Sequence, residues 1–276
     1  MQKYIHIDKA NLVSMDSILN HLAFLFYLLS AFSIWGFMTS KKNNSALQVV
    51  IWIFWLLAII CHVYELSPIF NGGYSVDLSL YYALILVAFI ISITLYISSI
   101  LGNTQFLGII ILPIISLVFL LDFTNNPVNV ALNNFIFIHV IISLISYSIL
   151  CLTAAQSLIV KLQEKKLQTN KPIGIIASLP SLDVMDKLLF KLLALGVLFL
   201  SISLISGLIF LEDMFSQHLA HKTILSILAW FIFMSLIVGR KIYGWRGSNA
   251  ANITLIGFFI LFLSYFGTKT VLEIIL

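Results

Sequence analysis

Charged residues are scarce in this chain, and their scarcity decides its broad class. Asp, Glu, Lys and Arg make up only 9% of the residues, whereas a soluble domain carries roughly a quarter. Hydrophobic residues make up 61%, and the mean hydropathy is +1.08. This composition excludes an ordinary soluble domain. The net charge of +4 is explained by basic loops on one side of a membrane, so no nucleic-acid partner is expected.

Reactive motifs are also missing. The chain has two cysteines, Cys61 and Cys151, with no C-x-x-C and no C-x-x-C-H sequence. We therefore expect neither a thiol relay nor a covalently attached c-type heme. Walker and dinucleotide-binding sequences are absent as well. No nucleophile has an evident base beside it, so the sequence does not predict an enzyme.

What the chain does contain is a series of apolar stretches, each near the length of about 20 residues that crosses a bilayer as a helix. Eight are present: Ser17–Thr39, Ala46–Leu66, Leu78–Ile100, Gln105–Leu121, Ala131–Val160, Lys187–Leu211, Ala220–Gly239 and Asn252–Val271. A membrane β-barrel would instead alternate over about ten residues per strand. The sequence predicts an all-α, polytopic helical bundle, with 1–276 forming a single integral membrane domain.

Lys and Arg orient these spans because they accumulate on the cytoplasmic side. They cluster after the first, fifth and seventh spans, while the alternate connections carry mainly Asp and Glu. This pattern places loops 40–45, 101–104, 161–186 and 240–251 inside and both termini outside. Arg240 and Arg246 are then interpreted as inner-side anchors, with Tyr243 and Trp245 at the membrane interface.

In this topology all six histidines lie on or near the outer face of the membrane. They are His6, His21, His62, His139, His218 and His221. Imidazole is a common ligand for heme and transition metals, and it is costly in hydrocarbon without a partner. The one-sided placement predicts ligand chemistry at the outer face.

His139 begins a polar stripe along the fifth span. At 1.5 Å per residue it lies roughly 12 Å below the start of that span. Helical periodicity places four small polar residues on the same face: Ser143, Ser146, Thr153 and Ser157. We expect these hydroxyls to hydrogen-bond across a helix interface. Close packing does not require an imidazole, so His139 is either a ligand or a buried hydrogen-bonding histidine.

Two further histidines are candidate ligands. His221 opens the seventh span beside Lys222, and it either binds a ligand or reaches the lipid headgroups. His62 ends the second span, where it is a ligand or an interfacial side chain. A heme held by two imidazoles from different helices satisfies these constraints, since the apolar spans would cover the macrocycle. Zinc fits less well because its sites usually recruit Cys, Asp or Glu beside His.

Three motifs occur in a fixed order: the HVIISLISY run at 139–147, GWRG at 244–247 and YFG at 265–267. In this order they resemble the cytochrome c assembly protein family, the membrane heme handlers of the CcsA and CcmC type. The resemblance is strongest over 131–276 and is closest to the eight-span branch of YpjD-like and HemX-like inner membrane proteins.

The resemblance implies a heme site at the outer face, with His139 matching an axial ligand. It also implies a Trp-rich outer segment ahead of the Lys222–Thr223 pair, but residues 212–219 contain no tryptophan. The family's second outer histidine, beyond the last span, has no match either. His221 or His62 would have to supply that ligand.

The leading hypothesis is therefore an inner (plasma) membrane protein that binds or moves heme b and supports cytochrome c assembly. Its expected partners are the lipid bilayer, heme and other cytochrome assembly components. A second hypothesis is a non-catalytic regulator whose cytoplasmic loops contact a heme-synthesis enzyme. A third is a permease without heme, although no inverted repeat and no carboxylate at mid-bilayer depth supports it.

Overall fold

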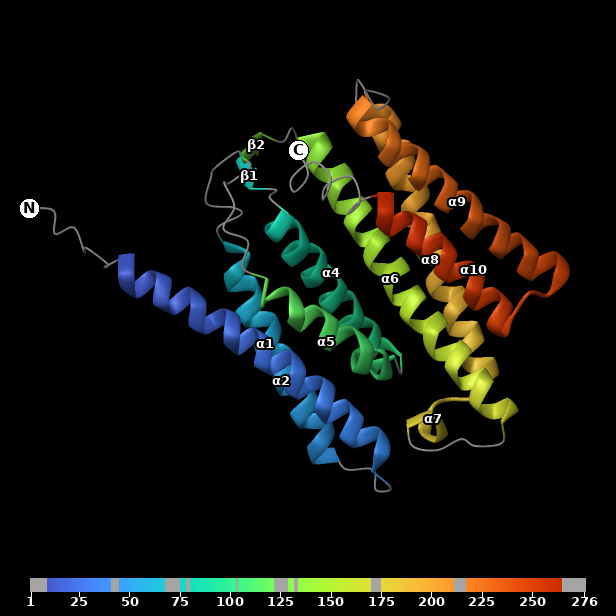
Figure 1. Cartoon of the computed structure of the whole chain (residues 1–276), viewed down its shortest axis with the longest axis horizontal. Coiled ribbons are helices and arrows are strands. Elements are labelled where there is room, and N and C mark those ends of the chain that lie inside the picture. The colour runs from blue at the N-terminus through green and yellow to red at the C-terminus, as the bar shows by residue number, and fades with distance from the viewer. Residues whose placement is uncertain are drawn as a thin grey trace, which may run out of the picture. The chain divides into compact units, whose positions relative to one another are not determined.

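The computed structural model describes residues 9–40, 45–67, 75–77, 80–102, 104–121, 129–131, 134–169, 175–210 and 217–264. Helices account for nearly all of these residues (Figure 1). In chain order the elements are α1 (Lys9–Thr39), α2 (Ser45–Glu65), β1 (Ser75–Asp77), α4 (Leu80–Leu101), η1 (Gln105–Leu107), α5 (Gly108–Val118), β2 (Asn129–Ala131), α6 (Asn134–Gln168), α7 (Ile175–Ser178), α8 (Leu182–Phe210), α9 (Gln217–Tyr243) and α10 (Gly247–Phe262). Strands β1 and β2 pair as a two-stranded sheet, the only one within the described ranges.

Six of these helices are long and apolar enough to cross a membrane, namely α1, α2, α4, α6, α8 and α9. Two shorter apolar stretches, Gln105–Val118 and Gly247–Phe262, occupy the positions of the fourth and eighth predicted spans. The prediction of an all-helical, multi-pass membrane bundle is confirmed.

Two of the four predicted inner loops, 161–186 and 240–251, contain more helix than the sequence suggested. Helix α6 continues to Gln168 and α8 begins at Leu182, so the predicted loop 161–186 is wrong over much of its length. Residues 161–168 are all Lys, Leu, Gln or Glu, which favour helix even outside the apolar region. The predicted loop 240–251 shrinks to 244–246, where Gly244 turns the chain with a φ of 68° that glycine adopts without steric cost.

Backbone contacts divide the chain into two compact units. Unit 1 comprises residues 1–92 and 108–130, and unit 2 comprises residues 93–107 and 131–276. In unit 1, helix α1 packs against α2 and α5. Its interior contains large, fully buried side chains such as Tyr27, Ile34 and Trp55.

In unit 2, helix α6 contacts α8 and α10, and α9 contacts the same two helices (Figure 1). Leu150, Leu193 and Phe233 belong to its buried apolar core. Gly196 lets α8 approach α6 closely, because a Cβ at this position would lie 2.7 Å from Leu150 Cδ2. Small residues serve this purpose at helix interfaces in membranes.

Candidate functional site

The predicted ligands are divided between the two units. His62 ends α2 in unit 1, whereas His139 in α6 and His221 in α9 belong to unit 2. His21 is exposed on α1. His6 and the side chains of His218 and His221 lie outside the described residues.

His139 is half-buried and contacts the neighbouring helix α8. Its Nδ1 lies 2.8 Å from Ser206 Oγ. One turn deeper, the hydroxyls of Ser143 and Ser203 lie 2.6 Å apart. Ser146 Oγ then donates to the Gly196 carbonyl at 3.1 Å. Ser143 and Ser146 therefore confirm the prediction of hydrogen bonds across a helix interface.

The remaining two members of the stripe behave differently. Thr153 donates to the Ile149 carbonyl, and Ser157 donates to the Thr153 carbonyl, both within α6. A hydroxyl that donates to a carbonyl one turn earlier in its own helix has its hydrogen bond inside an apolar bundle, so it needs no acceptor on a neighbouring helix. Cross-helix bonding was thus a wrong prediction for these two residues.

The tautomer of His139 depends on the hydrogen bonds around Ser206. Ser206 Oγ can donate its only hydrogen to the Ser203 carbonyl at 2.9 Å. With that donation it accepts from His139, and Nδ1 carries the ring proton. In this tautomer of the neutral imidazole, the other nitrogen, Nε2, holds a lone pair.

This arrangement is the one that metal-bound histidines adopt. Such a histidine usually donates one ring N–H to a protein acceptor, which orients the ring and leaves the second nitrogen for the metal. Ser206 can serve as this acceptor for His139, and Nε2 is then unprotonated. The chemistry of this side chain therefore fits an axial heme ligand.

Aromatic and aliphatic side chains surround the outer turn of α6. Phe135, one turn before His139, stacks on Phe210 of α8 with ring centroids 5.2 Å apart. Phe135 is 56% exposed and Ile138 is 50% exposed. Partly exposed apolar side chains therefore lie within about one helical turn of His139 on α6.

The side chain of His62 is fully buried, and it is enclosed by a hydrogen-bonded chain within unit 1. Trp55 Nε1 donates to Ser92 Oγ at 3.1 Å, and the hydroxyls of Ser92 and Tyr27 are 3.1 Å apart. Tyr27 Oη lies 2.9 Å from His62 Nδ1. His62 Nε2 lies 3.0 Å from the Ile85 carbonyl oxygen.

These contacts occupy both ring nitrogens of His62. The Ile85 carbonyl only accepts, so Nε2 carries the ring proton and Nδ1 accepts from the Tyr27 hydroxyl. Tyr27 Oη is also placed to donate to Ser92 Oγ, at 3.1 Å. The ring of Phe119 packs edge-on at a centroid distance of 4.8 Å. A ligand role for His62 stays a prediction, and it requires breaking one of these bonds.

The end of unit 2 where α9 ends and α10 begins holds an ion pair that the sequence did not predict. Arg240 Nη1 lies 2.7 Å from Asp186 Oδ2, and the guanidinium sits over the Phe190 ring at 4.6 Å from its centroid. Arg240 also donates to the Trp245 carbonyl at 3.0 Å. Arg240 therefore holds α8 and the turn before α10 together, in addition to its predicted role as an inner-side anchor. Arg246 is exposed, as expected of an anchor.

Two carboxylates cap the start of α10. Asp186 Oδ1 accepts from the Gly247 amide at 2.9 Å, and Glu164 Oε2 accepts from the Ser248 amide at 2.5 Å. The first amides of a helix lack partners within the helix and carry partial positive charge. Gly247 has a φ of 63°, and a Cβ there would lie 2.8 Å from Glu164. The GWRG sequence thus forms a tight, tertiary-capped turn.

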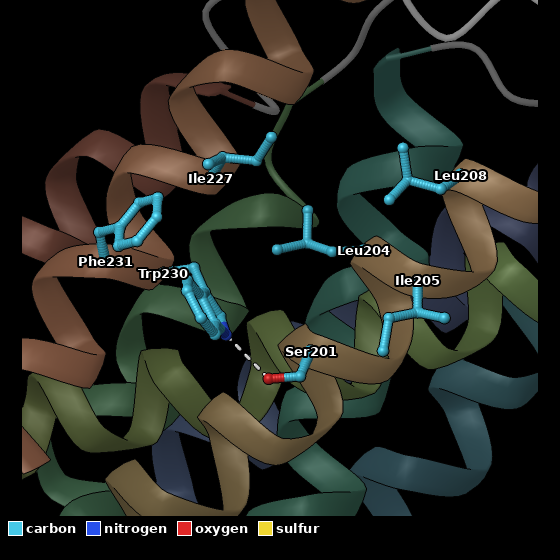
Figure 2. Close-up of a pocket in the computed structure, with 7 residues that line it drawn as sticks. All are labelled: Ser201, Leu204, Ile205, Leu208, Ile227, Trp230 and Phe231. Carbon is cyan, nitrogen blue, oxygen red and sulfur yellow. Dashed lines mark hydrogen bonds between the residues drawn. The ribbon is translucent and has the colours of Figure 1, made fainter.

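An apolar pocket lies between α8 and α9 (Figure 2), with a cavity volume of about 230 Å³. Its lining residues are Ser201, Leu204, Ile205, Leu208, Ile227, Trp230 and Phe231. Trp230 Nε1 donates to Ser201 Oγ at 2.8 Å across it. The volume is below the roughly 300–1,000 Å³ typical of ligand sites, and none of the lining side chains is a common metal ligand. This pocket is therefore not the candidate heme site.

Within the described part of the chain, no three His, Cys, Asp or Glu side chains are grouped to hold a metal ion. A bare ion such as zinc would need about four protein ligands. A porphyrin brings four nitrogens of its own, so an iron porphyrin needs only axial ligands. A single histidine such as His139 therefore suits an iron porphyrin better than a bare metal ion.

Comparison with known proteins places these features in a family. The model described as Cytochrome C assembly protein matches residues 18–276. The inner membrane protein YpjD of Escherichia coli strain K12 is 32% identical over 138 residues, which is 50% of this chain and 52% of YpjD. The cytochrome c biogenesis protein CcsA of Chlamydomonas reinhardtii is 26% identical over 145 residues, or 51% of this chain and 39% of CcsA.

These matched segments span about half the length of YpjD and less of CcsA. No solved structure matches the chain. The family match covers nearly all of the sequence, and the helices form the expected multi-pass bundle. The chain is a multi-pass membrane protein, and it belongs to the cytochrome c assembly protein family.

Proposed function

We propose that this chain binds heme b through Nε2 of His139, near the outer face of the inner membrane, and supports cytochrome c assembly. The observation that carries the proposal is the contact of His139 Nδ1 with Ser206 Oγ at 2.8 Å. When Ser206 donates to the Ser203 carbonyl, it accepts the Nδ1 proton, and the lone pair is then on Nε2. That nitrogen can bind ferric or ferrous iron without first losing a proton.

The surroundings of His139 support an iron porphyrin more than a bare ion. The exposed Phe135 and Ile138 and the stacked Phe210 offer apolar and aromatic surface to a planar macrocycle. Burial of the macrocycle edge against such surface contributes favourable free energy of about 25 cal/mol per Å². When bound, the heme supplies a redox-active iron. The chain's own residues ligate, orient and shield it.

Our preferred candidate for the second axial ligand is His221. It belongs to the same unit as His139, and it immediately precedes Lys222, which lies close enough to His139 for its charge to act on the ring. His62 is the alternative ligand. It would have to give up its bond to Tyr27 or to the Ile85 carbonyl, and each bond is buried.

The assembly role rests on the family and on the relative named as a cytochrome c biogenesis protein. Heme handling of this kind requires binding and release rather than bond chemistry. The proposed partners are therefore heme and other cytochrome assembly components, and the protein contributes a site instead of a catalytic group.

Absorption spectra of the purified wild type and the His139→Gly variant test this proposal. The wild type should bind heme stoichiometrically, with a Soret band and sharp α and β bands after reduction. His139→Gly should lose them, and added imidazole should restore them by filling the space of the missing ring. His21→Ala, an exposed histidine of α1, is the matched control and should keep the bands.

A folded His139→Gly protein with an unchanged spectrum would contradict the proposed ligand. The assembly role has a separate readout, the amount of covalent c-type heme in cells. Replacing the wild-type gene by the His139→Gly version should reduce it. Unchanged c-type heme in those cells would contradict the assembly role.

A further inference from the structure

Lys191 lies within the apolar part of α8. It is the last charged residue of this helix, since every residue from 192 to 210 is uncharged. The ion pair of Asp186 with Arg240 lies five residues earlier in α8, so Lys191 is roughly 7.5 Å farther along the helix axis. Charged side chains inside membrane spans are costly and usually have a defined partner. Lys191 therefore needs an anionic partner.

The acidic side chains of α8 do not supply that partner. Asp183 pairs with Lys187 at 2.6 Å, and Asp186 pairs with Arg240 at 2.7 Å. Within the described ranges, no ion pair or side-chain hydrogen bond involves Lys191. The Lys191 side chain is exposed, and the side chains of a helix tilt toward its N-terminus. Its ammonium group is therefore directed back toward Lys187, where an anionic group from outside the chain can reach it.

Beyond Lys191, exposed apolar side chains form a stripe on the same face of α8. They follow Lys191 at spacings of 4, 3, 4 and 3 residues, which keeps them on one side of a helix. Each is between 41% and 57% exposed. The members of this apolar stripe are Leu195, Leu198, Ile202 and Ile205. A cation followed by an apolar stripe is complementary to a phospholipid, whose phosphate lies at the membrane surface and whose tails lie deeper.

The pocket between α8 and α9 adjoins the far end of the apolar stripe (Figure 2). Ile205 belongs to both, and Leu208 and Phe231 are each 60% exposed, so the pocket opens on the surface of the bundle. Ser201, the first pocket residue of α8, lies ten residues or roughly 15 Å beyond Lys191. That distance is half of the ~30 Å hydrocarbon core, which is the depth of one leaflet. A lipid tail that starts at Lys191 therefore reaches the pocket.

We propose that α8 binds one anionic phospholipid, with its phosphate between Lys187 and Lys191 and one tail along the apolar stripe toward the pocket. The two lysines are four residues apart, so they are neighbours on the helix surface. Lys187 can exchange Asp183 for the phosphate, because an ion pair between exposed side chains contributes little. Ammonium–phosphate contacts are charge-assisted hydrogen bonds, and a zwitterionic lipid would bring its own cation to them. This lipid site is independent of the proposed heme site.

Titration with two phospholipids tests this inference. The probes are phosphatidylglycerol and phosphatidylcholine with identical tails, each added to the purified full-length protein in a non-ionic detergent, and the bound lipid is counted by native mass spectrometry. We expect the wild type to bind phosphatidylglycerol about tenfold more tightly, equivalent to roughly 1.4 kcal/mol. Lys191→Gln should bind both lipids alike, at the affinity of the wild type for phosphatidylcholine.

Three further variants separate the headgroup, the tail and the general charge. Lys191→Arg should retain the preference, because it retains the cation. Lys166→Gln removes an exposed lysine near the end of α6 and should also retain it. Ile205→Asn places a polar group where the stripe meets the pocket, so it should weaken the binding of both lipids and leave the preference between them. The comparison of the two lipids in the wild type needs no substitution, so it remains decisive even if Lys191→Gln does not fold.

Each other outcome overturns a stated claim. Equal binding of the two lipids by the wild type, or a preference that persists in Lys191→Gln, would overturn the headgroup site. A preference that disappears in Lys166→Gln would show attraction to the overall charge of the protein, and it would overturn the headgroup site as well. Unchanged lipid binding by Ile205→Asn would overturn the path of the tail.

Discussion

His62 and His139 show how differently one side chain is treated in the two units. In unit 1, His62 is sealed, with Nδ1 accepting from Tyr27 and Nε2 donating to the Ile85 carbonyl. In unit 2, His139 Nδ1 can donate to Ser206 Oγ, which itself can donate to the Ser203 carbonyl, and Nε2 then keeps its lone pair. Both lie in apolar spans, where an unpaired imidazole is costly.

The difference arises from the partners and not from depth or exposure alone. A backbone carbonyl beside Nε2 forces the proton onto that nitrogen and removes it as a ligand. A serine that has already donated its hydrogen forces the proton onto Nδ1 and frees Nε2. The direction of one neighbouring hydrogen bond therefore separates a structural histidine from a candidate ligand.

The largest effect on stability is expected from removing the sealed histidine. His62→Ala leaves the Tyr27 hydroxyl and the Ile85 carbonyl without their partner and opens a cavity beside Phe119. We expect the free energy of unfolding to fall by about 3 kcal/mol, measured by denaturant unfolding in detergent. His21→Ala, exposed on α1, should change it by less than about 0.5 kcal/mol. Equal effects of the two substitutions would refute the sealed role.

The second largest effect is expected on the heme affinity of His139. Ser206→Ala removes the acceptor of the Nδ1 proton, so the His139 ring loses its orientation and its fixed tautomer. We expect heme affinity to fall about 10- to 100-fold, measured by spectroscopic titration. Ser201→Ala, on the pocket side of the same helix (Figure 2), should leave the affinity unchanged. If Ser206→Ala binds heme as tightly as the wild type, the tautomer argument fails.

A smaller effect is expected at the far end of the chain of hydrogen bonds in unit 1. Trp55→Phe removes the donor to Ser92 but keeps most of the buried ring. The free energy of unfolding should fall by about 1 kcal/mol, and the heme spectrum should not change. A spectral change in Trp55→Phe would show that the sealed cluster contributes to the heme site.

The smallest effect is expected from Ser143→Ala, which removes the bond to Ser203 next to His139. Side-chain hydrogen bonds between membrane helices contribute about 0.6 kcal/mol on average, so the unfolding midpoint should move only slightly. A loss above about 2 kcal/mol would mean that the polar stripe holds α6 and α8 together more strongly than we infer.

Hydropathy and charge were sufficient to predict the helical membrane bundle, because about 20 apolar residues in a bilayer have few structural alternatives. The hydroxyl stripe on α6 was also accessible, since helical periodicity places Ser143 and Ser146 on one face. The sequence could not show that Thr153 and Ser157 bond within their own helix, because that choice depends on the neighbouring helix.

The roles of the histidines depended on contacts distant in sequence. His62 is sealed by Tyr27, 35 residues away, and no local pattern predicts such a partner. The GWRG turn likewise depends on Asp186 and Glu164 from two other helices. Capping across helices leaves no periodic signal, so the sequence analysis did not identify these two carboxylates.

The most direct test compares the same substitution at the two histidines. His62→Gln and His139→Gln are each measured for the reduced heme spectrum and for unfolding in detergent. We predict that His139→Gln loses the sharp α and β bands with little loss of stability, whereas His62→Gln keeps the bands and unfolds more easily. Bands that survive in His139→Gln and disappear in a folded His62→Gln would contradict the assignment of the open and sealed histidines.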